Sequence, residues 1–203
     1  MLIGKIEQKK KKKEQAIEQA AFELFDEKGI AGVSIDMIAR RAGIAKGTFY
    51  LYFKDKDAVL AHVVFRRGAQ VLAQAMQQAM QQNIEDPIER IIYVTDYAID
   101  LLKNDPAVLR VIRKNLSWSL MQSGLQSADD TGADSEVTQL LRQYLSQLES
   151  WGYTAEEAFQ LVFMVVELIG STCYCSIVLG QLPDIDTVKP MLFTAIRKML
   201  RPS

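Results

Sequence analysis

Residues 34–56 are the stretch that most constrains how this chain can fold. They read SIDMIARRAGIAKGTFYLYFKDK, in which apolar residues recur at helical spacing up to the small Ala39. Gly43 follows four residues later, where a tight turn needs a residue that tolerates a positive φ. Ile44 and Phe49 then point back into the same small core. This spacing predicts a helix-turn-helix, an arrangement whose second helix can lie in the major groove of DNA.

The residues after the turn separate this hairpin from one made only for packing. Small and polar side chains open the second helix over residues 45–48, which suits a close approach to base edges. Tyr50, Tyr52, Lys54 and Lys56 follow, and all of them can donate hydrogen bonds to phosphate oxygens. An ordinary helix hairpin with a glycine turn has no need of that set, so the stretch favours DNA binding.

Charge is distributed unevenly along the chain. Residues 1–67 hold 14 Lys and Arg against 9 Asp and Glu, a net of +5, whereas residues 68–203 hold 10 against 16, a net of −6. The total of −1 argues against non-specific nucleic-acid binding, but a basic first third on an acidic remainder is typical of a DNA-binding head on a separate body. Lys5 and the lysines of residues 9–13 have two open interpretations: a solvated helix start or frayed tail, and an arm that contacts phosphate or the minor groove.

The rest of the sequence favours an all-α protein. Amphipathic stripes at helical spacing recur, and no segment predicts a convincing sheet strand. Residues 154–179 are predicted to be a helix with almost no polar face, which in a soluble protein must be covered on all sides, and residues 186–200 an amphipathic one. No uninterrupted apolar run approaches the ~20 residues that span a bilayer, and the N-terminus does not resemble a signal peptide. We therefore expect a cytoplasmic protein with no membrane segment.

The residues that could carry catalysis are few. Cys173 and Cys175 are two residues apart on a predicted helix, about 200° around its axis, so they are interpreted as small apolar residues and not as a disulfide or metal pair. His62, the single histidine, is interpreted as a surface or packing residue. We find no glycine-rich phosphate loop, metal-ligand cluster or Ser/His/Asp set, and predict no catalytic residue, metal or cofactor. An enzyme, or a dimeric helical scaffold with a vestigial helix-turn-helix head, remains the alternative.

Over residues 21–60 the chain resembles the TetR family of transcriptional regulators, through AFELFDEKG and then SIDMIARRAGIAKGTFYLYFKDKDAVL. The resemblance implies about nine helices. It divides them into a DNA-binding head, residues 1–54 with the basic arm 1–13, and a ligand-binding and dimerisation body, residues 55–203. It also implies a homodimer formed through the last two helices, a palindromic operator in double-stranded DNA, and a repressor released by a small-molecule effector.

The resemblance further implies roles for individual residues. Base-edge contacts would come from Ala45, Lys46 and Thr48, and phosphate contacts from Ser34, Tyr50, Tyr52 and Lys56. Lys46 could face a phosphate instead of a base.

Candidate ligand-binding residues are aromatic side chains of the body helices and one acid: Phe65, Tyr93, Tyr97, Trp118, Phe159, Phe163 and Glu167. Plain core packing is the alternative for each aromatic. Glu167 has three open interpretations: it pairs with an arginine, binds a cationic ligand, or faces outward at a gap in the dimer.

Overall fold

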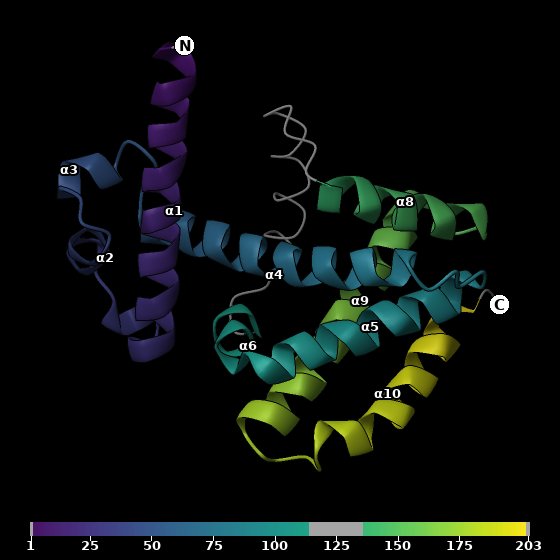
Figure 1. Ribbon diagram of the computed structural model, residues 1–203. Helices are drawn as coiled ribbons and strands as arrows, with labels where there is room; N and C mark the ends of the chain where they lie inside the picture. The colour runs from purple at the N-terminus through teal and green to yellow at the C-terminus, as the bar shows by residue number, and fades with distance from the viewer. Residues whose placement is uncertain (1, 114–135, 202–203) are drawn as a thin grey trace. The chain divides into compact units, whose positions relative to one another are not determined.

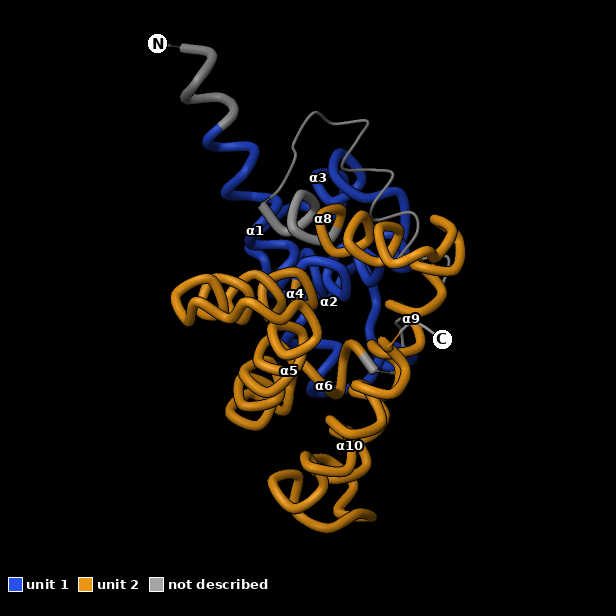
Figure 2. The backbone as a smooth tube through the Cα atoms, turned by 90° about the vertical axis from the view of Figure 1, so that its right-hand side faces the viewer, with its two compact units in different colours: residues 1–66 blue, residues 67–203 orange. Residues whose placement is uncertain are grey.

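The structure, a computed structural model, describes the backbone of residues 2–113 and 136–201 and the side chains of residues 8–112 and 142–201. Within these residues the chain forms nine α-helices, one 3-10 turn and one π-helical turn, and no strand (Figure 1). The predicted all-α fold is confirmed. Two compact units divide the chain, Met1–Arg66 and Arg67–Ser203 (Figure 2). The functional division predicted between residues 54 and 55 stays a prediction.

The first unit contains three complete helices, the 3-10 turn η1 and the first turns of a fourth helix. Their bounds are α1 (Leu2–Lys28), η1 (Ile30–Gly32), α2 (Ile35–Arg41), α3 (Lys46–Phe49) and α4 (Lys56–Met80). Ile17, Ile38, Phe49, Val59 and Val63 are fully buried and form its core. These apolar residues recur at helical spacing, so each helix presents one stripe to the same interior.

Helix α1 begins well before the first residues of its apolar stripe, which runs in the sequence from Ala16 to Phe25. It includes the lysine run, and residues 8–13 are exposed on it. Lysine is a good helix former, so a charged run can extend a helix that is anchored further along the chain. The lysines are therefore part of a solvated helix, while their contact with DNA stays a prediction.

The second unit holds the rest of α4 and the later helices. Their bounds are α5 (Pro87–Asn104), α6 (Pro106–Arg113), α8 (Glu136–Ser150), α9 (Ala155–Cys173), the π-helical turn η2 (Tyr174–Val178) and α10 (Ile185–Leu200). Local chemistry sets where α5 and α9 start: Asp86 accepts hydrogen bonds at the start of α5, and Thr154 forms a capping box with Glu157. Cys173, a free buried thiol, lies in the main core with Ile99 and Ile196.

The apolar helix predicted over residues 154–179 is present as α9 followed by η2. Residues Ala155–Val178 are long and apolar enough to cross a membrane by length and composition, with a mean hydropathy of 2.0, and 17% of that window is buried within the chain. Met164, Leu179 and Met191, which lie on or next to the last two helices, are large exposed apolar residues. In the described residues of a single chain, α9 therefore keeps apolar surface that nothing covers.

Candidate nucleic-acid interface

Local hydrogen bonds and backbone conformation set both the start of α2 and the turn between α2 and α3. Ser34 has extended backbone and its hydroxyl accepts a hydrogen bond from the Met37 amide at 3.3 Å, so it caps α2. Gly43 has φ 67°, a left-handed conformation that L side chains rarely adopt. The Ile44 amide then donates to the Ala39 carbonyl at 3.0 Å, which closes the turn. Ser34 is exposed, so its hydroxyl lies at the surface while it caps the helix.

Helix α3 is one turn long and is anchored by a single aromatic residue. Phe49 is fully buried, and its ring lies edge-on to Tyr50 with centroids 5.6 Å apart. Because Phe49 takes the inward position, Ala45 and Lys46 at the start of the helix are exposed, and Thr48 is half-buried. Tyr50 is exposed and Tyr52 half-buried. The structure thus places the three predicted base-edge residues on one short element with Tyr50 directly after it.

Leu51 is a surface residue that the sequence reasoning missed. Its side chain is 78% exposed, beside Tyr50 at the end of α3. The spacing was the available signal, because Phe49 and Phe53 are four residues apart and fall on one side of a helical turn. Both are buried in the structure, and Leu51 between them is directed outward. An exposed apolar side chain at this position suits contact with a thymine methyl group in the major groove.

Lys46 is held by an acid of the preceding helix. Its Nζ donates to Asp36 Oδ2 at 2.9 Å, and this hydrogen bond raises the pKa of Lys46. Both side chains are about half exposed, so the ion pair is weak and can exchange with other partners. Contact of Lys46 with a base or a phosphate requires it to leave Asp36.

Lys56, which is predicted to contact a phosphate, donates hydrogen bonds to the protein backbone in this structure. Its Nζ donates to the carbonyl oxygens of Ile30 at 2.8 Å and Val33 at 3.1 Å. These carbonyls belong to the connection between α1 and α2, so Lys56 ties that connection to the start of α4. An ammonium group has three donors, which leaves one for a phosphate. The phosphate role of Lys56 stays a prediction.

Two neighbouring arginines on α2 have different surroundings. Arg41 donates to both carboxylate oxygens of Glu27, at 2.6 and 2.9 Å, and this pairing lowers the pKa of Glu27. Arg40 is exposed and has no ion-pair partner among the residues that the structure describes. Arg40 is therefore the arginine of this surface whose charge is available to a phosphate.

His62, the single histidine, lies in a partly buried polar cluster of the first unit. Glu18 on α1 is 5% exposed, and its Oε2 lies 3.5 Å from His62 Nε2 and 3.4 Å from Arg66 Nε. The His62 ring also lies edge-on to Phe53, with centroids 5.1 Å apart. These contacts join α1 to the first turns of α4 and give His62 a packing role.

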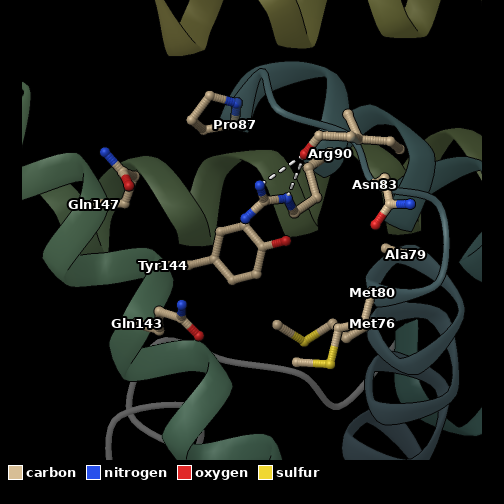
Figure 3. Close-up of a pocket in the computed structure, with 10 residues that line it drawn as sticks. Met76, Ala79, Met80, Asn83, Pro87, Arg90, Gln143, Tyr144 and Gln147 are labelled. Atoms are coloured by element: carbon tan, nitrogen blue, oxygen red, sulfur yellow. Dashed lines mark hydrogen bonds between the residues drawn. The ribbon is translucent and has the colours of Figure 1, made fainter.

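The second unit contains a cavity of about 300 Å³. The end of α4, the following loop, the start of α5 and the middle of α8 line it, as Figure 3 shows. Its described lining residues are Met76, Ala79, Met80, Asn83, Ile84, Pro87, Arg90, Gln143, Tyr144 and Gln147. A cavity of this volume is at the lower end of the range for small-molecule sites.

The predicted ligand-binding residues are not among these. Tyr93 and Tyr97 pack against the small cluster of Ala75 and Met76, next to the cavity. Phe65, Phe159, Phe163 and Glu167 are half-buried elsewhere on α4 and α9, and Trp118 lies outside the described residues. A ligand-binding role for all seven stays a prediction.

Comparison with known proteins agrees with this geometry. Residues 17–63 match the family described as bacterial regulatory proteins, tetR family. An HTH-type transcriptional regulator from Staphylococcus aureus strain USA300 is 43% identical over 56 residues, which are 28% of this chain and 30% of that protein. The chain thus matches about a third of the length of such curated relatives.

Solved structures resemble the chain over most of its length. A putative TetR-family transcriptional regulator from Syntrophomonas wolfei has a TM-score of 0.65 at 19% identity, over 94% of this chain and 96% of that one. The transcriptional regulator FadR from Bacillus subtilis, solved in complex with stearoyl-CoA, has a TM-score of 0.58 at 20% identity, over 90% and 96%. The fold and the turn define a helix-turn-helix protein. Residues 17–63 thus match the tetR-family regulatory domain, and the chain is similar in fold to solved TetR-like regulators over most of its length.

Proposed function

We propose that this protein is a cytoplasmic repressor that binds a palindromic operator as a homodimer and releases it when a small molecule binds the body. The observation that carries the DNA-binding part is the exposed start of α3. There Ala45 and Lys46 are exposed and Thr48 is half-buried, on or directly before a helix held by buried Phe49 and a glycine turn, within the segment that matches the tetR family. Exposed small and polar side chains on a rigid helix suit the major groove.

The homodimer is supported by the apolar surface of the last two helices. Most of the apolar window on α9 is not buried within the chain, and Met191 on α10 is 74% exposed. A second copy would remove that surface from water and give a two-fold assembly with two heads. Two heads would read half-sites whose centres are about 34–36 Å apart or a multiple of that distance.

Release by an effector would act through α4. This helix begins at Lys56 in the first unit and ends at Met80, beside the cavity of the second unit. A ligand that binds one arrangement of α4 more tightly shifts the population toward it. A coupling of about 1–3 kcal/mol would change DNA affinity about 5- to 150-fold.

Selection of bound sequences from random duplex DNA tests this function. We expect enrichment of one palindrome, a dimer by analytical ultracentrifugation, and two spaced half-sites in the footprint. Thr48→Ala should relax the preference at one base position, whereas Tyr50→Phe should weaken all sequences alike. A chain that enriches no sequence even at low salt would instead be a helical scaffold with a vestigial head.

A further inference from the structure

Arg90 is the one ionised side chain among the described residues that line the cavity. Its Nε and Nη2 donate to the carbonyl oxygen of Ile84 at 3.2 and 2.7 Å. A guanidinium has five N–H donors, so three remain for another partner. Because the bonded group is a neutral carbonyl, these contacts orient the guanidinium without neutralising its charge.

Two of the acids at the start of α5 are engaged elsewhere. Glu89 accepts two hydrogen bonds from Arg197 on α10, at 2.7 and 2.8 Å, and the Asp86 side chain accepts from the first amides of α5. Arg90 has no ion-pair partner within residues 8–112 and 142–201, in contrast to Arg197. A half-buried cation without a carboxylate attracts an anion, because partial burial reduces the screening of its charge by water.

Tyr144 adds a neutral donor beside this cation. Figure 3 shows its ring next to the Arg90 guanidinium, with Gln143 and Gln147 of α8 on the same side of the cavity. Burial raises the pKa of the Tyr144 phenol, so the hydroxyl stays protonated and can donate a hydrogen bond. The polar wall of the cavity thus offers N–H and O–H donors and, among its described residues, no carboxylate.

The opposite wall is mostly apolar, with Asn83 as its one polar side chain among the described lining residues of α4 and the loop after it. Met76 and Ala79 are buried on α4, and Met80 follows one turn later with its side chain more exposed. The Met76 and Met80 sulfur atoms lie on the α4 side of the cavity in Figure 3. Methionine side chains adjust to irregular apolar shapes, which suits an aliphatic chain.

We propose that this cavity binds a small organic oxyanion with an apolar tail, held at its charged end by Arg90 and Tyr144 and along its tail by Met76 and Met80. The proposal rests on the function proposed above and names the class of its effector. The charge of this ligand is opposite to that of the cationic ligand that Glu167 suggested from the sequence. Such a ligand would contact α4, α5 and α8 together, and would hold the end of α4 in one position.

Calorimetric titration of the full chain without DNA tests the ligand class. The probes are octanoate, octanamide, octyl phosphate and octylammonium, which share the tail and differ in the head. We expect octanoate to bind at least about tenfold more tightly than octanamide, since the amide cannot form charge-assisted hydrogen bonds of the same strength. Tighter binding of octyl phosphate than of octanoate would support the oxyanion site and assign it to a phosphate ester. Equal binding of octanoate and octanamide, or tighter binding of octylammonium, overturns the proposal.

Variants place the binding in this cavity. Arg90→Gln should reduce octanoate binding about tenfold to a hundredfold and leave octanamide unchanged. The matched control Lys198→Gln removes an exposed cation of α10 and should change neither. Tyr144→Phe, which removes only the hydroxyl and keeps the packing, should weaken octanoate severalfold. Equal octanoate affinity in the parent, Arg90→Gln and Tyr144→Phe proteins refutes the assignment.

A separate measurement of operator binding distinguishes failure of this inference from failure of the function on which it rests. A protein that binds its selected operator but no octyl oxyanion retains the DNA-binding function and loses this inference. A protein that binds octanoate through Arg90 but enriches no DNA sequence retains the anion site and loses the proposed operator function.

Discussion

Substitution of Lys56 by methionine separates a structural role from a DNA contact at one residue. Methionine keeps the length and most of the packing of the side chain and removes the ammonium group. The two carbonyl oxygens that Lys56 bonds, those of Ile30 and Val33, lie more than 20 residues earlier in the chain. The substitution therefore loosens the connection that carries Ser34 into α2, whether or not DNA is present.

The expected loss of stability follows from the surroundings of the two hydrogen bonds that methionine cannot make. A hydrogen bond to a charged group contributes about 1.5–3 kcal/mol to stability. Lys56 is only half-buried, and the Ile30 carbonyl keeps a second bond from the Val33 amide at 3.3 Å, so the lower end of that range applies. We expect the free energy of unfolding to fall by about 2–3 kcal/mol, a large share of the 5–15 kcal/mol of an ordinary domain.

Urea unfolding followed by circular dichroism measures this decrease, with Lys54→Met as the matched control. The Lys54 side chain is 83% exposed and has only a 3.9 Å ion pair with Asp55, so its substitution should cost less than about 0.5 kcal/mol. Equal unfolding midpoints for the two variants would refute the structural role of Lys56.

The salt dependence of operator binding then reports on phosphate binding by Lys56. Removal of one lysine–phosphate interaction makes the slope of log K against log salt shallower by about 0.9. If Lys56 also reaches a phosphate, its variant shows this shallower slope; if it acts only through the fold, affinity falls with the slope unchanged.

Three further predictions concern other parts of the chain. Asp36→Asn should release Lys46 and raise operator affinity in an anisotropy titration about two- to fivefold, and a loss of affinity would contradict this. Burial raises the pKa of Cys173 to about 12, so a thiol reagent near pH 8 should titrate at most Cys175 in the folded protein and both thiols in urea; two reactive thiols in the folded protein would count against that burial. The capping hydrogen bonds lower the pKa of Glu157 from its ordinary 4.5, so its stabilisation is present above that value and is lost as the pH falls through the lower folded-state pKa. The stability difference between the parent and Glu157→Ala should therefore shrink in acid, and a difference that grows would show the wrong sign.

Much of the head could be predicted from sequence because its features are local. A capping hydroxyl at Ser34, a positive φ at Gly43 and an inward Phe49 depend on neighbours within a few residues. The start of α1 could not be placed this way. The lysine run has helix propensity and also like-charge repulsion, and a local pattern does not say which effect prevails.

The hydrogen-bond partners of the charged residues could not be predicted from the sequence for another reason. Lys46 pairs with an acid 10 residues away, and Lys56 bonds carbonyls 23 and 26 residues away. The sequence shows that these lysines are basic and near the turn, which is equally consistent with DNA contact and with support of the fold. Tertiary packing decides which oxygen lies within hydrogen-bond distance.

The sequence by itself determined the helical class, the glycine turn, the exposed start of α3 and the surplus of apolar surface on α9. Each depends on residue type and on spacing along one helix, which the chain carries wherever its elements pack. Only the tertiary structure decided which side chains line the cavity. Arg90 of α5 is oriented by a carbonyl of the preceding loop and meets Tyr144, 54 residues later on α8. That meeting depends on how three helices pack, and no local pattern encodes the distance between residues so far apart.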